Sequence, residues 1–189
     1  MKTYKKTMNV PILEIRHEED STSPREWSNL GYFITIDNKY NSPDKNEILE
    51  NVIRETGDEA SDLDDHIRRI KQNCQDIVAI YLISKYEHGG VSYGLGRRNG
   101  WDYSNNGFYV ITKETQKELG TKKKDFQRVI EDELDIYNKY ISGEVYSFVL
   151  YDKDGEVEDS CGGFYDIEDI REHLPKGWEK ESLEEYIIE

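Results

Sequence analysis

Cys161, His88 and Asp102 are the residues of this sequence best suited to covalent chemistry. A thiol becomes a nucleophile when a histidine accepts its proton and a carboxylate orients that histidine. Cys161 stands in the glycine-flanked segment SCGG, and the other two residues stand on either side of a Gly-rich stretch. The trio defines one hypothesis, a small enzyme or ligand-binding domain. The interpretation we favour makes Cys161 a small buried residue beside a backbone bend.

The Gly-rich stretch itself is YEHGGVSYGLGRRNGWDYSNNGFYV, residues 86–110. Its glycines do not match the GxGxxG pattern of dinucleotide-binding proteins, because the next glycine after Gly94 and Gly96 is Gly100. We therefore expect an exposed connection between two strands rather than a phosphate-binding loop.

Arginine and aromatic side chains from the same stretch are candidate contacts with a protein partner. Arg97 and Arg98 can bind a carboxylate or a phosphate, or they can pair with the protein's own carboxylates. Trp101 and Tyr103 follow closely, and aromatic and Arg residues dominate binding hot spots.

A third candidate site is a row of carboxylates that imitates the phosphates of nucleic acid. The apolar spacing of residues 125–142 predicts a helix with Glu131, Asp132 and Asp135 on its outward face. Side chains four residues apart on a helix stand about 5–6 Å from each other, comparable with neighbouring phosphates on one strand. A solvated helix face explains the same pattern without mimicry. A second acidic helix start adds the candidates Asp62, Asp64 and Asp65.

No segment predicts a metal site or a cofactor. The segment YDKDGEVED places Gly155 three residues after Asp152, whereas a calcium-binding EF-hand loop needs its glycine at the sixth position. Cys74 and Cys161 are far apart and lack CxxC spacing, so we expect two reduced thiols.

The charge of the chain excludes one class of partner and favours another. Its 189 residues carry 40 Asp and Glu against 25 Lys and Arg, a formal net charge of −15. Direct binding to nucleic acid is disfavoured, because such binding needs cations that displace the counterions of phosphate. A protein that normally grips nucleic acid remains a suitable partner. The sequence shows no signal peptide and no membrane span, so we expect a cytoplasmic protein.

Strands and helices interleave without the regular spacing of parallel βαβ units. Expected strands are residues 9–15, 32–36, 77–83, 108–112, 145–151 and 156–160. Expected helices are residues 44–57, 61–74, 112–119, 125–142 and 166–174, the first of them capped by Asp44. The pattern predicts an α+β fold with a mixed or mainly antiparallel sheet packed against helices. The length fits a single domain over residues 1–178, followed by an acidic C-terminal tail at 179–189.

Three blocks of the chain together resemble a family of small acidic proteins encoded by bacteriophages and mobile elements. The blocks are SPREWSNLG (23–31), YEHGGVSY…WDYSNNGFYVITKE (86–114) and GEVYSFVLYDKDGEVEDSCGGFYD (143–166). Motif positions fall on Trp27, His88, Trp101, Asp102, Gly107, Phe108, Ser160, Cys161 and Phe164. The chain departs from the family pattern at Ser28 and Gly162, where Asp and Trp are usual, and at Arg97 and Arg98.

The resemblance implies a function in the contest between phage and host. Small acidic phage proteins often disarm defences that target nucleic acid. Our leading hypothesis is a non-enzymatic inhibitor of a CRISPR effector or restriction nuclease in the bacterial cytoplasm, acting by protein–protein binding and nucleic-acid mimicry. The alternatives are the enzyme or ligand-binding domain described above, and a structural or regulatory phage protein without mimicry. A homodimer is the other association we consider.

Overall fold

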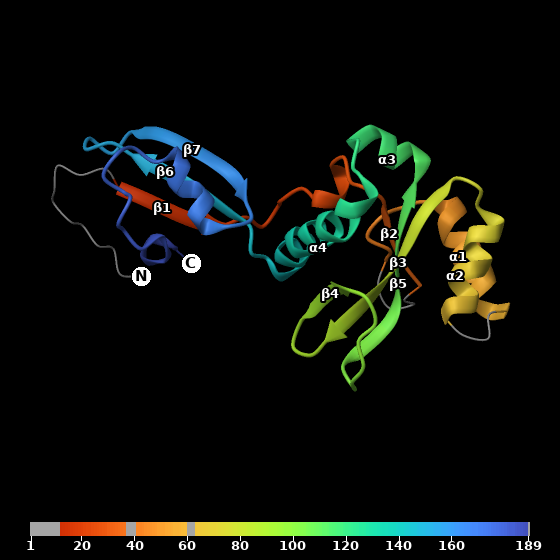
Figure 1. Cartoon of the computed structure of the whole chain (residues 1–189). Coiled ribbons are helices and arrows are strands. Elements are labelled where there is room, and N and C mark those ends of the chain that lie inside the picture. Colours follow the sequence, from red (N-terminus) through yellow and green to blue (C-terminus); the bar gives the residue numbers. More distant parts are fainter. Residues whose placement is uncertain (1–11, 37–40, 60–62, 189) are drawn as a thin grey trace. The chain divides into compact units, whose positions relative to one another are not determined.

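The described residues form two compact units. The structure is a computed structural model that describes residues 12–36, 41–59 and 63–188. Unit 1 combines Met1–Thr22 with Ser142–Glu189, and unit 2 is Ser23–Ile141. Each unit contains an antiparallel sheet packed against helices, which confirms the α+β class (Figure 1). Length alone predicted one domain. Unit 1 combines segments from both ends of the chain, and no Pro- or Gly-rich linker marks the boundary between the units in the sequence.

Unit 2 is built on a four-stranded sheet in the order β2-β5-β3-β4. Its strands are β2 (Tyr32–Thr35), β3 (Ile77–Glu87), β4 (Val91–Leu95) and β5 (Tyr103–Thr112). The apolar run IVAIYLI lies in β3, an interior strand as predicted. The exposed connection expected at residues 86–110 is largely sheet instead. The chain turns at Gly89, where φ is +72°, and pairs back as β4.

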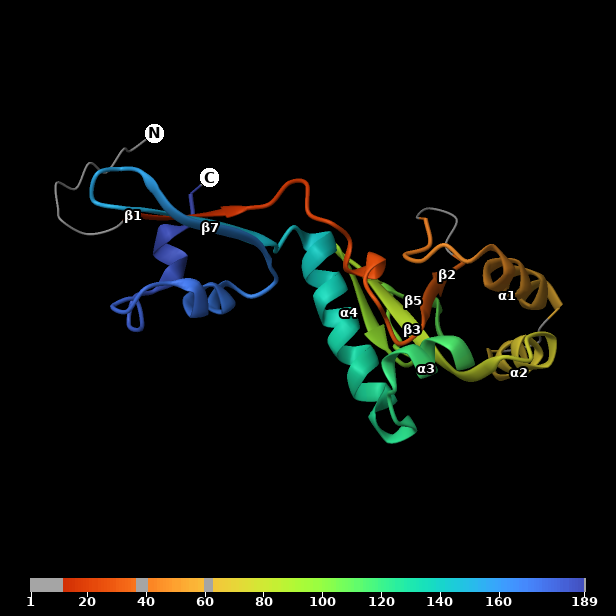
Figure 2. The same cartoon turned by 90° about the horizontal axis from the view of Figure 1, so that it is seen from above.

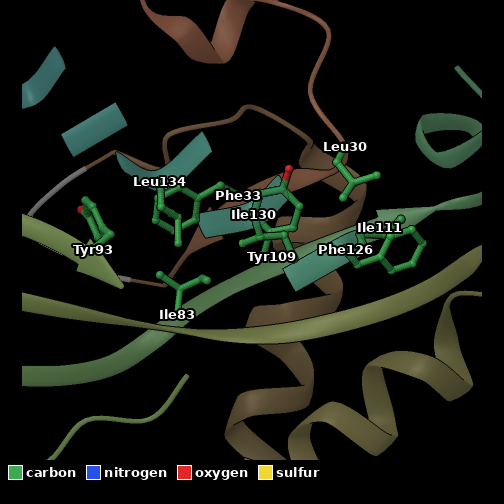
Figure 3. Packing of buried hydrophobic residues seen from close by; sticks show 9 residues of the cluster. All are labelled: Leu30, Phe33, Ile83, Tyr93, Tyr109, Ile111, Phe126, Ile130 and Leu134. Carbon is green, nitrogen blue, oxygen red and sulfur yellow. The ribbon is translucent and has the colours of Figure 1, made fainter. Parts of the chain in front are cut away.

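Helices cover both faces of this sheet. One face packs against α1 (Glu47–Glu59) and α2 (Leu63–Asn73), and the other packs against α4 (Phe126–Ser142) (Figure 2). Strand β5 shows the division, because Phe108 faces the first pair of helices and Tyr109 faces α4. Figure 3 shows the cluster on the α4 side, in which every labelled side chain is nearly or fully buried.

Two helix boundaries illustrate which local signals are reliable. The short helix α3 (Lys113–Leu119) is capped by Thr112, one residue later than the predicted start, and ends as predicted at Gly120, whose φ is +63°. Helix α1 begins later than predicted, because Asn46 rather than Asp44 accepts the hydrogen bond from the N–H of Leu49 (3.1 Å). The carboxylate of Asp44 is occupied by a buried arginine described below.

Unit 1 is a three-stranded sheet covered by 3₁₀ helices. Its order is β1 (Ile12–His17), β6 (Tyr146–Tyr151) and β7 (Val157–Phe164). The 3₁₀ helices η3 (Ile167–His173) and η4 (Leu183–Tyr186) contribute Ile170 and Leu183 to its core. Leu183 is fully buried, and Ile187 pairs with Ile15 of β1. The segment expected to be an acidic tail therefore contributes to the core of unit 1. Although most of its residues are charged, its Leu183 packs inside.

We expect Leu183→Ala to lower the free energy of unfolding of unit 1 by about 2–5 kcal/mol, since it removes a fully buried side chain. Trp178, buried in the same core, reports unfolding in urea through its fluorescence. Glu185→Ala on the same 3₁₀ helix is the matched control and should change stability by less than about 0.5 kcal/mol. Equal stability of the two variants would contradict a packed C-terminal segment.

Candidate functional site

The most exposed aromatic side chain of the described residues lies between β4 and β5. Trp101 is fully exposed, and Tyr103, which begins β5, is 39% exposed. The rings of Tyr86 and Tyr103 lie 5.0 Å apart between centroids. The backbone of Arg98 is held by Asn105, which accepts from the Arg98 N–H at 2.9 Å and donates to its carbonyl at 2.8 Å. We call the segment from Gly96 to Tyr103 the hairpin end; it connects β4 to β5, which are separated in the sheet by β3.

The two arginines of the hairpin end are exposed. Within the residues that the structure describes, no carboxylate lies within ion-pair distance of Arg97 or Arg98. The suggestion that they neutralise the protein's own surplus carboxylates is thus not supported by the geometry. Beside them lies an open depression of about 380 Å³. It is lined by Ser84, Tyr86, Ser92, Tyr93, Gly94, Arg98 and Tyr103.

The three residues proposed for covalent chemistry do not share a unit. His88 Nδ1 lies 3.5 Å from Asp102 Oδ1 in unit 2, where the side chain of His88 is largely exposed and that of Asp102 is partly buried. Cys161 belongs to β7 of unit 1. The prediction that Cys161 is a buried residue beside a bend was wrong, because Cys161 lies within the edge strand β7, where it and its neighbours are exposed.

The acidic candidates of α4 and α2 lie on opposite sides of the sheet of unit 2. Several are neutralised locally. Asp132 pairs with Arg128 (2.9 Å), and Asp135 pairs with Lys139 (3.1 Å). In α2, Asp65 pairs with Arg68 and Arg69, whereas Glu131 and Asp64 are exposed. Asp62 lies outside the described residues. The five described positions therefore do not form one continuous row of phosphate-like charges.

The surplus negative charge is concentrated in unit 1 instead. Residues 142–189 contain 15 Asp and Glu against 4 Lys and Arg, more than two thirds of the net charge of the chain. Within residues 152–169, eight acidic side chains stand against one basic side chain. Net charge per segment would have revealed this asymmetry, but no helical periodicity marks it.

Arg25, in the block SPREWSNLG, was not among the predicted site residues, yet it lies at the centre of a buried polar network. Its side chain is 3% exposed and all its N–H groups have acceptors. Nη2 donates to Asp44 Oδ2 at 2.6 Å, and Nη1 donates to Glu133 Oε2 at 2.8 Å. The remaining acceptors are Asn29 Oδ1 and the carbonyl of Gly31.

The partners of Arg25 are themselves fixed by further hydrogen bonds. Asp44 accepts from the N–H of Phe33 (2.5 Å), and Glu133 accepts from the N–H of Leu30 (2.8 Å) and from the hydroxyl of Tyr109. Gly31 completes the network, since a Cβ there would lie 2.5 Å from the carbonyl oxygen of Val110. The block thus fastens one loop to the sheet and to α4, which explains its composition structurally.

The charges of this network stabilise one another. Burial alone would lower the pKa of Arg25, but the hydrogen bond and the charge of Asp44 raise it overall. Burial, followed by the charge of Glu133, raises the pKa of Tyr109 well above its ordinary value. Arg25 is therefore charged and Tyr109 neutral at every physiological pH.

Trp27 is half exposed and borders a polar depression of about 320 Å³ next to this network. Lys45 and Glu118 also line it. Because Arg25, Asn29, Asp44 and Glu118 of its lining already have protein partners, this depression offers less to a ligand than the hairpin end does.

Comparisons with protein-family models, curated proteins and solved structures find no match to this chain. The resemblance to acidic phage proteins therefore stays a prediction. Across residues 12–36, 41–59 and 63–188, no three His, Cys, Asp or Glu side chains gather as metal ligands. Over the same ranges, no helix has the length and apolarity to cross a membrane.

We expect Glu133→Ala to lower the free energy of unfolding by about 3 kcal/mol, because it removes one of the two carboxylates that pair with the buried Arg25 and leaves one Arg25 N–H and the Leu30 N–H without an acceptor. Chemical denaturation measures the change. The matched control is Glu131→Ala, two residues earlier on the exposed face of α4, for which less than about 0.5 kcal/mol is expected. A loss of similar size at both positions would show that the network is not what stabilises unit 2.

The two thiols should differ in reactivity. Burial raises the pKa of Cys74, which lowers its thiolate fraction near neutral pH, whereas Cys161 is exposed. With a chromogenic disulfide reagent at pH 8, one thiol per chain should react rapidly. Cys161→Ser should abolish this rapid phase and Cys74→Ser should leave it intact; the reverse assignment would contradict the placement of Cys161 on an open edge strand.

Proposed function

We propose that this protein is a non-enzymatic, phage-type inhibitor that binds a host enzyme which targets nucleic acid, such as a CRISPR effector or a restriction nuclease. The observation that carries the proposal is the hairpin end. It presents a fully exposed Trp101 beside two exposed arginines on a protein whose net charge is −15. Exposed tryptophan and arginine are the residue types that most often dominate binding energy once a partner covers them.

The hairpin end is well suited to contact because the sheet supports it. Strands β3 and β5 pair over most of their length, and the Asp102 carbonyl accepts from the Glu87 N–H at 2.9 Å. Asn105 holds the backbone of Arg98 in the way described above. A side chain displayed on a held backbone loses less conformational entropy on binding than one on a mobile loop.

The acidic character of the chain supports a partner that normally binds nucleic acid. Such enzymes display Lys and Arg along the channels that receive DNA or RNA, and complementary charge accelerates association with them. In this proposal the contribution of mimicry comes mainly from residues 142–189, where the acidic surplus is greatest. Glu131 and Asp64, both exposed in unit 2, are secondary contributors.

Trp101→Ala should weaken binding to the target by roughly thirtyfold, as loss of a central aromatic anchor does, and should leave stability unchanged because the side chain is exposed. The functional measurement is plaque formation by a targeted phage on cells that carry a CRISPR or restriction system. Wild-type protein should restore plaques and Trp101→Ala should not. Affinity capture from the same cells should recover the nuclease with wild-type protein only.

Trp27→Ala is the matched control, since it removes the other exposed tryptophan of unit 2. It should inhibit as well as the wild type does. The proposal fails if wild-type protein leaves every tested defence active, or if Trp101→Ala inhibits equally well.

A further inference from the structure

The edge strands of the two sheets differ in whether their outer backbone groups have hydrogen-bond partners. An edge strand leaves a row of backbone N–H and C=O groups without partners, which proteins usually cover. In unit 2 the edge strand β2 is covered by the segment that follows it. The Phe33 carbonyl accepts from the Asp44 N–H (3.1 Å), and the Thr35 N–H donates to Ser42 Oγ (3.1 Å).

The opposite edge of that sheet, β4, is covered by a side chain. The amide of Asn138, from α4, accepts from the N–H of Tyr93 at 2.7 Å and donates to its carbonyl at 2.8 Å. This pair of bonds imitates the contacts of a neighbouring strand. In unit 1, the edge strand β1 is covered by the C-terminal segment, where the Ile188 N–H donates to the Ile15 carbonyl at 2.9 Å.

Strand β7 is the exception within the part of the chain that the structure describes. It is the last strand of its sheet, and no backbone partner lies on its outer side among these residues. Seven of its eight residues are exposed. The N–H of Ser160 is met only by the carboxylate of its own neighbour, Asp159, at 2.8 Å. A carbonyl from an incoming strand can replace this local contact.

The charges around β7 identify the kind of strand it fits. Glu156 precedes the strand, Glu158 and Asp159 stand within it, and Asp166 follows it, all of them exposed. Lys153 is the one cation of residues 152–169. An added strand therefore meets carboxylates along its length, and opposite charges across a strand pair stabilise the pair.

We propose that β7 is a docking edge for an extended, Lys- or Arg-rich segment of a partner protein, which adds to the sheet of unit 1 as an antiparallel strand. Backbone hydrogen bonds supply the pairing, and the carboxylates select a basic segment. A second copy of this chain is a poor occupant, because it brings eight acidic side chains to meet eight others. This surface does not depend on the hairpin end of unit 2.

A fluorescent ten-residue peptide in which Lys alternates with Val is the probe. Full-length protein should bind it, and should not bind the same peptide with Glu in place of Lys. A fully N-methylated Lys–Val peptide keeps every charge but has no backbone N–H, and it should also fail to bind. On binding the Lys–Val peptide, amide hydrogen exchange should slow within residues 157–164 of the protein.

Charge reversal at the edge, Glu158→Lys with Asp159→Lys, should weaken binding of the Lys–Val peptide by roughly tenfold, the loss of two exposed ion pairs. Glu172→Lys with Glu185→Lys is the matched control: it makes the same change of charge on exposed residues of η3 and η4. This control and Trp101→Ala should bind the peptide as the wild type does.

Three results would overturn the inference. The first is equal binding of the N-methylated peptide, which would reduce the effect to charge alone. The second is slowed exchange outside β7 only. The third is a concentration-dependent dimer in which residues 157–164 are protected without peptide. Peptide binding that persists in Trp101→Ala separates this edge from the hairpin end, so either proposal can fail while the other stands.

Discussion

The buried ion pair between Arg25 and Asp44 is the interaction on which the organisation of unit 2 depends. Taking a guanidinium out of water is costly unless each of its N–H groups finds an acceptor. Here the acceptors come from the loop that carries Arg25, from the segment after β2 and from α4. A single side chain thereby joins three parts of the chain that are distant in sequence. It also diverts Asp44 from the helix-capping role that its position before α1 suggests.

The parts of the fold set by local periodicity were predictable from the sequence. The apolar run of β3, the helix α4 with its helically spaced apolar residues and the short helix α3 all appear where their patterns place them. The parts set by tertiary contacts were not. Strand β4 is short and contains a glycine, so its alternation is too weak to distinguish from a loop. The division into two units escapes any inspection of neighbouring residues, because strands β1 and β6 meet across more than a hundred positions.

The candidate sites of the sequence relied on two kinds of signal, residue type and helical spacing. Arg97, Arg98, Trp101 and Tyr103 were selected because their chemistry suits binding, and they are neighbours because they lie within seven positions of the sequence; Arg98 and Tyr103 line one depression. The acidic row was selected from helical spacing, and the structure separates its members and pairs several of them with nearby cations. Spacing within one helix says nothing about which long side chains of opposite charge lie within reach, nor about which face of a sheet each helix covers.

The discontinuous make-up of unit 1 has a consequence for how the protein is made. Strand β1 leaves the ribosome early, but its partner β6 is synthesised only after all of unit 2. The segment that ends in β1 therefore stays unpaired while unit 2 emerges. Contacts so remote in sequence carry a large loop-closure entropy, which a folded unit 2 reduces by shortening the effective loop. Folding should therefore proceed from the middle of the chain outward, with the most acidic part of the protein acquiring its structure last.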